Sequence, residues 1–179
     1  MKINLSKTIA ENMLALIHDA NPSAASTVTL DKITVGPVQA LTGDASGKNS
    51  QVTVTAKANM GYSQSVTIKY NRLGVNQGVN PLPASISIFP ADTQAQRKTK
   101  VAAALGLMES QITVTAVGGG DIGLPANEDD TSVSVTVTPL ANSSLYVGNP
   151  LNIQLTTPDT DIPLGNVVTV LVMNGFDPA

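Results

Sequence analysis

Two stretches of this chain carry nearly the same alternating phrase, and that repetition constrains the fold more than any other feature. NSQVTVTA occupies positions 49–56 and DTSVSVTV occupies positions 130–137. In both, Val alternates with Thr or Ser, which is the period-two pattern of a β-strand that is buried on one face. A single pair of this kind is common in strand-rich proteins, so its meaning depends on what surrounds it.

A helix signal precedes each copy of the phrase. Thr8-Ile-Ala-Glu11 and Thr93-Gln-Ala-Gln96 both have the spacing of a capping box and lie 85 positions apart (93 − 8). Apolar residues follow each box at three- and four-residue steps, as on one face of a helix. Asn21 and Gly106, again 85 apart (106 − 21), are residue types that tolerate the left-handed conformation at a helix end.

Three further segments of the first half have counterparts in the second, at offsets of 82 to 85 positions that change only across loops. The pairs are STVTL at 26–30 with SQITV at 110–114, SVTIKYNRL at 65–73 with PLNIQL at 150–155, and ASISIF at 84–89 with NVVTVLVM at 166–173. In the last pair, Pro81-Leu82 precedes the first segment and Pro163-Leu164 precedes the second.

These patterns predict an α+β protein of two tandem pseudo-repeats, residues 1–90 and 91–179. Each repeat is expected to contain one amphipathic helix packed on a small, mainly antiparallel sheet of about four strands. Units of this size have exposed edge strands, so we expect the two to pack together or to extend one another's sheets.

Composition excludes several classes of function. Of the 179 residues, 42% are hydrophobic but only 3% are aromatic, so the core is expected to be aliphatic. The net charge of −3 argues against a nucleic-acid binder, and a charged fraction of 13% gives little protection against self-association. The absence of Cys removes disulfides and thiol chemistry. No apolar run reaches the ~20 residues of a membrane span, and polar residues interrupt any signal-peptide core at the N-terminus.

The ionisable residues form no recognised catalytic or metal-binding motif, so we expect a protein that is not an enzyme and needs no cofactor. His18, the one histidine, lies near the end of the first predicted helix, where the helix dipole explains it as well as a general-base role would. The acidic loop from Asp121 to Asp130 could offer oxygen ligands to Ca²⁺, but its order is not that of an EF-hand, and a solvated connection is the alternative. Asp159 and Asp161 are explained equally well by turn chemistry.

Two other features have both a functional and a plain structural interpretation. VGGGDIG at 117–123 is rich in glycine, yet it lacks the Lys-Ser/Thr ending of a phosphate-binding loop, so we expect a bulge or connector. Arg97, Lys98 and Lys100 cluster on the second predicted helix. They could form a basic patch for an acidic partner or simply a solvated helix face.

The stretch GYSQSVTIKYNRLGV at 61–75 ends a predicted strand with Tyr70-Asn71-Arg72-Leu73. It resembles a short domain of virion structural proteins from large tailed bacteriophages, in which an amphipathic helix is followed by strands and a Tyr-Asn-Arg-Leu or Tyr-Thr-Arg-Leu ending. The resemblance covers about residues 5–75. The second half keeps the order of elements but has Ile-Gln-Leu-Thr-Thr, residues 153–157, in place of that ending.

The resemblance implies a non-enzymatic subunit of a phage particle, in the capsid decoration, neck or tail. Its expected partners are other virion proteins and copies of itself, with assembly in the host cytoplasm, while the net charge and the short apolar runs argue against contact with nucleic acid or membrane. Arg72 could bridge to a carboxylate of a neighbouring subunit with Tyr70 as an anchor, or it could cap the strand end within its own chain.

The alternative function is a tandem binding module of a surface adhesin or carbohydrate-binding protein. Strands rich in Thr and a chain without Cys fit that class as well. A glycan site normally uses exposed aromatic platforms, for which Tyr62 and Tyr146 are the candidates.

Overall fold

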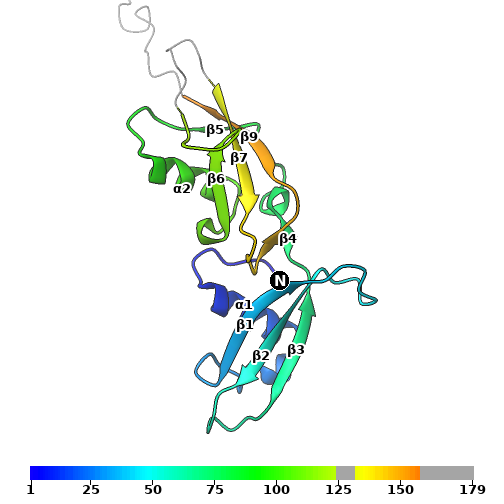
Figure 1. Ribbon diagram of the computed structural model, residues 1–179. Helices are drawn as coiled ribbons and strands as arrows, with labels where there is room; N and C mark the ends of the chain where they lie inside the picture. The colour runs from blue at the N-terminus through cyan, green and yellow to red at the C-terminus, as the bar shows by residue number, and fades with distance from the viewer. Residues whose placement is uncertain (124–131, 158–179) are drawn as a thin grey trace, which may run out of the picture.

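The computed structural model describes residues 1–123 and 132–157. Within these residues the chain forms two α-helices and three small β-sheets that are mainly antiparallel, so the predicted α+β class is confirmed. Each helix accompanies one of the two larger sheets, and the two helix-and-sheet units lie end to end (Figure 1). Neither of the described helices combines the length and apolar character that crossing a membrane requires.

Both helices begin where the sequence predicts. Helix α1 (Ile9–Ala20) and helix α2 (Gln94–Ala104) each start with a complete capping box. Thr8 Oγ accepts from the Glu11 N–H at 3.2 Å while the Glu11 carboxylate accepts from the Thr8 N–H at 2.7 Å. Thr93 and Gln96 repeat the arrangement, at 3.3 and 2.8 Å. These bonds satisfy N–H groups that a helix start otherwise leaves unpaired.

The two helices end by different means. Gly106 follows α2 with φ +61°, the left-handed conformation expected of it. Asn21 follows α1 with φ −135°, and its side-chain amide donates to the Ile17 carbonyl oxygen at 3.0 Å instead. The end of α2 therefore relies on the conformational freedom of Gly106, whereas the end of α1 relies on the Asn21 side chain.

The first unit consists of α1 and an antiparallel sheet of strands in the order β1-β2-β3. These strands are β1 (Ile33–Ala40), β2 (Ser50–Ala56) and β3 (Ser65–Tyr70). The core lies between the helix and one face of the sheet, where alternate β2 residues are buried because strand side chains point to opposite faces in turn. Its buried members are Met13, Ile17, Ile33, Val52, Val54 and Tyr70.

The prediction of a strand at residues 26–30 is wrong. The chain leaves α1 through a 3₁₀ turn, η1 (Pro22–Ala24), and the turn continues because Thr27 and Val28 N–H groups both donate to the Ala24 carbonyl oxygen. Local hydrogen bonds therefore occupy backbone groups that a strand would have needed for pairing. The first strand starts only at Ile33.

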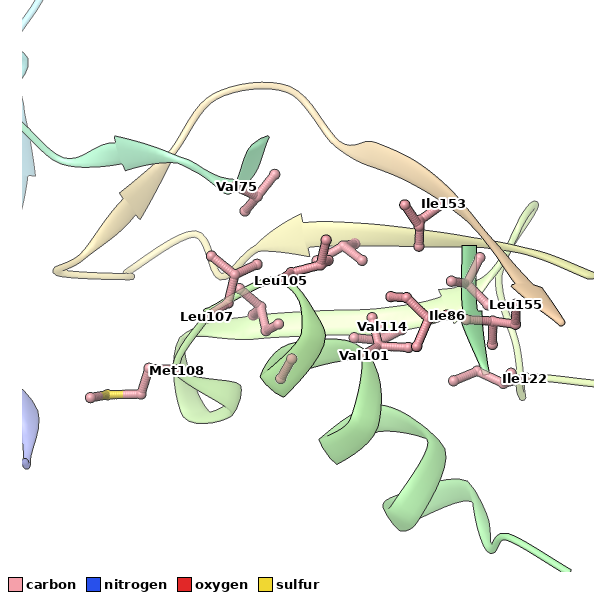
Figure 2. Packing of buried hydrophobic residues seen from close by; sticks show 14 of the residues in the cluster. Val75, Ile86, Val101, Leu105, Leu107, Met108, Val114, Ile122, Ile153 and Leu155 are labelled. Atoms are coloured by element: carbon pink, nitrogen blue, oxygen red, sulfur yellow. The ribbon is translucent and has the colours of Figure 1, made fainter. Parts of the chain in front are cut away.

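The second unit consists of α2 and a four-stranded sheet in the order β5-β9-β7-β6. Strand β7 runs antiparallel to both of its neighbours, whereas β5 runs parallel to β9. Figure 2 shows aliphatic side chains from α2 and from several strands meeting in one core. The strands are β5 (Ser85–Ser87), β6 (Ile112–Ala116), β7 (Ser132–Pro139) and β9 (Leu151–Thr156), and a short 3₁₀ helix, η3 (Glu109–Gln111), precedes β6.

Strand β5 departs from the expected division of the chain at residue 90. We expected residues 84–89 to complete the first sheet, and that expectation is wrong, because β5 pairs with β9 in the second sheet. The chain reaches it through η2 (Val75–Gln77), whose Val75 is buried in the second core. Strand β5 therefore extends the sheet of the second unit, although it precedes α2 in the chain.

Several predicted features lie outside the described residues. They are the strand at 166–173 with the preceding Pro163-Leu164, the acidic residues Glu128 to Asp130, and Asp159 and Asp161.

Candidate functional site

The two units meet at a junction built from a pair of two-residue strands. Strand β4 (Leu73–Gly74) pairs in parallel with β8 (Tyr146–Val147), and the Leu73 N–H donates to the Leu145 carbonyl oxygen at 2.9 Å. The end of β3 leads directly into this pair, so the residues at the end of β3 contact the second unit.

Arg72 is the central polar residue of the junction. Its side chain is 7% exposed, and its guanidinium donates from Nη1 to the Ser143 carbonyl oxygen at 2.9 Å and from Nε to Ser50 Oγ. No carboxylate forms an ion pair with Arg72 among the described residues. Of the two roles considered for this residue, the structure shows the intrachain one.

Tyr70 and Asn49 support the same contact. Tyr70 is buried, its hydroxyl donates to the Ser144 carbonyl oxygen at 2.9 Å, and burial raises the pKa of the phenol above 10, opposed by the nearby Arg72 charge. Asn49 accepts from the Arg72 N–H at 2.8 Å and donates to the Arg72 carbonyl oxygen at 3.0 Å. Both backbone polar groups of Arg72 are therefore satisfied.

On the other side of the junction, the turn before β8 is held by its own buried network. Gln111 Oε1 accepts from Ser143 Oγ at 3.0 Å and from the Ser144 N–H at 2.8 Å. The Ser143 hydroxyl oxygen also accepts from the Tyr146 N–H at 3.0 Å. These bonds fix the position of the Ser143 carbonyl group that Arg72 contacts. Sequence reasoning missed Ser50, Gln111 and Ser143 because they match no motif.

Arg97, on the predicted basic patch, is buried rather than presented to solvent. It is 8% exposed, and its Nη1 donates to the Ile122 carbonyl oxygen at 2.6 Å. The Gln94 side chain binds the same residue, because its Oε1 accepts a hydrogen bond from the Ile122 N–H at 3.0 Å. Both side chains hold the end of the glycine-rich segment 118–120 against α2, and the three glycines there have positive φ, as a connector requires.

The two lysines of the patch differ in how far they are engaged. The ammonium group of Lys100 pairs with the Asp92 carboxylate at 2.6 Å and lies 4.5 Å from the centre of the Phe89 ring. The hydrogen bond from Lys100 lowers the pKa of Asp92. Lys98 is partly exposed and lines a small hollow beside β6 with Glu109. Intersubunit contacts of Tyr70, Arg72, Arg97, Lys98 and Lys100 stay a prediction, and Lys98 is the one whose side chain has no hydrogen bond within the described chain.

The His18 ring Nε2 lies 2.8 Å from the Val28 carbonyl oxygen, a contact that fastens the turn after α1. No group of three or more His, Asp or Glu side chains is arranged to hold a metal ion within residues 1–123 and 132–157. A hollow of about 470 Å³ beside η2 is lined by uncharged residues that lie between Asn76 and Leu82.

The first unit has a sheet edge that is open to pairing with a further strand, and this is the outer edge of β3. Among the described residues this strand pairs with β2 alone. Its residues Val66 and Ile68 share the face that carries buried Tyr70, yet Val66 is 60% exposed and Ile68 only partly buried. By contrast, the opposite edge strand β1 has a register shift around Gly36-Pro37, and Pro lacks an N–H to offer a new strand.

Comparison with known proteins gives one finding. The model of a family of unknown function, DUF7941, matches residues 2–177. No curated protein and no solved structure matches.

Proposed function

We propose that this chain, which belongs to the DUF7941 family of unknown function, is a non-enzymatic structural subunit of a bacteriophage particle. It acts through protein–protein interfaces in the capsid decoration, neck or tail, with copies of itself and other virion proteins as partners. The Tyr70-Asn71-Arg72-Leu73 ending supports the phage assignment through its resemblance to virion domains.

The open edge of β3 is the observation that carries an assembly role. A sheet edge without a partner offers unpaired backbone N–H and C=O groups, and proteins that remain monomeric usually block such edges. Here β1 is blocked and β3 is not, while the apolar Val66 beside the edge stays exposed. These features are what a subunit joined by sheet extension would need.

The proposal includes a duplication, in which each unit is a copy of one helix-and-sheet module. The order of elements supports it. In both units a helix with a capping box is followed by three longer strands that pair antiparallel in chain order, β1-β2-β3 and β6-β7-β9. A tandem pair of modules would present each kind of interface twice, which suits a repeating shell or tube.

The alternative, a carbohydrate-binding or adhesin module, has less support. Tyr146 is 1% exposed and its hydroxyl oxygen accepts from the Met108 N–H at 2.9 Å, so it offers no platform to a sugar. Tyr62 is exposed, but the Lys32 ammonium lies 5.7 Å from the centre of its ring.

The test of the proposed function is whether the chain is a constituent of particles. Particles from the phage that encodes it are purified on a density gradient and analysed by quantitative mass spectrometry. We expect peptides of this chain to sediment with the particles in many copies per genome. The proposal is refuted if the chain is abundant in the infected-cell lysate and absent from the purified particles.

A further inference from the structure

In the second unit, the core is closed at one edge by a strand that comes from before α2. Ile86 of β5 lies opposite Leu155 of β9, and the Ile88 N–H donates to the Thr156 carbonyl oxygen at 2.9 Å. Ile86 and Ile88 are both buried (Figure 2 shows Ile86 beside Leu155). The fourth strand of one unit thus covers the last core strand of the next.

The first unit lacks this cover among the described residues. In the repeat alignment β3 corresponds to β9, with Ile68 at the position of Ile153, 85 residues apart (153 − 68). Ile153 is 7% exposed, whereas Ile68 is only partly buried and Val66 is open. The place that β5 fills beside β9 is therefore vacant beside β3 in this part of the chain.

The sequence contains a segment of the right kind for that place. Residues 166–173, NVVTVLVM, follow Pro163-Leu164 as β5 follows Pro81-Leu82, at an offset of 82. At that offset Val168 and Val170 correspond to the buried Ile86 and Ile88. The segment has six apolar residues among eight and no charge, a composition that is typical of a strand covered on both faces.

The segment is too close to the end of β9 to reach β3 of its own chain. A strand that pairs in parallel with β3 must start beside Ser65, at the end of β3 far from the junction, whereas β9 ends far from the junction on the other side (Figure 1). Two six-residue strands laid end to end span roughly 40 Å. The nine residues 157–165 span at most about 32 Å even when fully extended. The route must also pass the junction, so a second chain is the better acceptor.

We propose that residues 166–173 of one copy pair in parallel with β3 of another copy and complete its sheet, as β5 completes the second sheet within the chain. Each chain then donates one strand and accepts one. Because donor and acceptor surfaces differ, the contact is head-to-tail and generates a ring or a helical filament rather than a closed dimer. The inference rests on the proposed function in assuming that the chain works by assembly, and it names the partner and the contact.

The first experiment measures the mass of the assembled species by analytical ultracentrifugation over a concentration series. Val168→Asp places a carboxylate on the face that would enter the acceptor core, whereas the control Thr169→Asp places it on the opposite face. Val66→Asp and its neighbour Thr67→Asp form the same pair on the acceptor side, and both residues are exposed in the described chain. We expect the wild type and the two Thr variants to assemble and both Val variants to remain monomeric, with unchanged circular dichroism.

The second experiment mixes the two Val variants. The Val168→Asp chain keeps an intact acceptor edge and the Val66→Asp chain keeps an intact donor segment, so an equimolar mixture should form one heterodimer of two 18.4 kDa chains and stop there. A mixture that stays monomeric, or Val variants that assemble like the wild type, overturns the strand donation. If the wild type and both Val variants assemble equally well, a different contact joins the copies. That result would overturn the strand donation but not the proposed role as a structural subunit. Absence of the chain from purified particles would refute the phage role without touching the contact.

Discussion

Replacing Arg72 by Ala should loosen the junction between the two units. The guanidinium donates two hydrogen bonds, to Ser50 and Ser143, from a side chain that is almost fully buried. Hydrogen bonds from a charged group contribute about 1.5–3 kcal/mol each, so the two together contribute about 3–6 kcal/mol. Part of this loss is offset, because the variant no longer has to bury a cation without a carboxylate. We expect the free energy of unfolding to fall by about 3 kcal/mol net.

Urea denaturation followed by far-ultraviolet circular dichroism measures this change, at a protein concentration low enough to keep the chain monomeric. A loss of that size should also lower the melting temperature by roughly 6–12 °C for a chain of this length. Arg72→Lys keeps the charge but lacks the fork that reaches two acceptors, so its loss should be smaller. Lys48→Ala, in an exposed loop of the same unit, should change stability by no more than about 0.5 kcal/mol.

The result that would refute this reasoning is an Arg72→Ala variant as stable as Lys48→Ala. The junction would then be held by the β4–β8 pair and apolar packing, and the arginine would be incidental to the fold. A lower dependence of the unfolding free energy on urea in Arg72→Ala would instead indicate that the two units unfold separately once the contact is lost.

Three further outcomes are expected. Thr93→Ala removes the acceptor of the capping box and should cost about 1 kcal/mol of unfolding free energy, measured by urea denaturation. Gly106→Ala should lower the melting temperature more than Gly61→Ala does. Both glycines have positive φ, but an added Cβ at Gly106 would meet a Val79 methyl group at 2.9 Å, whereas Gly61 faces open space. Equal losses in melting temperature would contradict this reasoning. Asp44 has its pKa lowered from 3.8 to about 2, chiefly by the hydrogen bond from Lys69, so its contribution to stability is present above about pH 4 and is lost as the pH falls toward 2. Melting temperatures of wild type and Asp44→Asn should accordingly differ at pH 5 and converge as the pH falls through 2.

The errors in the sequence reading have a common physical cause. The strand predicted at 26–30 alternates as a strand should, but the turn after Pro22 takes up its backbone hydrogen bonds. The segment around β5 has the right pattern for a strand, yet alternation does not say which sheet a strand joins. The sequence also left open whether Arg72 bridges to a neighbouring subunit and whether Arg97 belongs to a basic patch, and in the structure both are buried against carbonyl oxygens of their own chain.

The sequence by itself determined what depends on neighbours within a few residues. Both helix starts, the glycine stop of α2 and the strands β2, β3, β7 and β9 follow from capping and alternation, which act over one turn or one pleat. Only the tertiary structure decided the sheet that β5 joins and the acceptors of Tyr70 and Arg72, which lie 74 and 71 positions away. Such contacts leave no local pattern, because their energy comes from groups that meet only after the chain has folded.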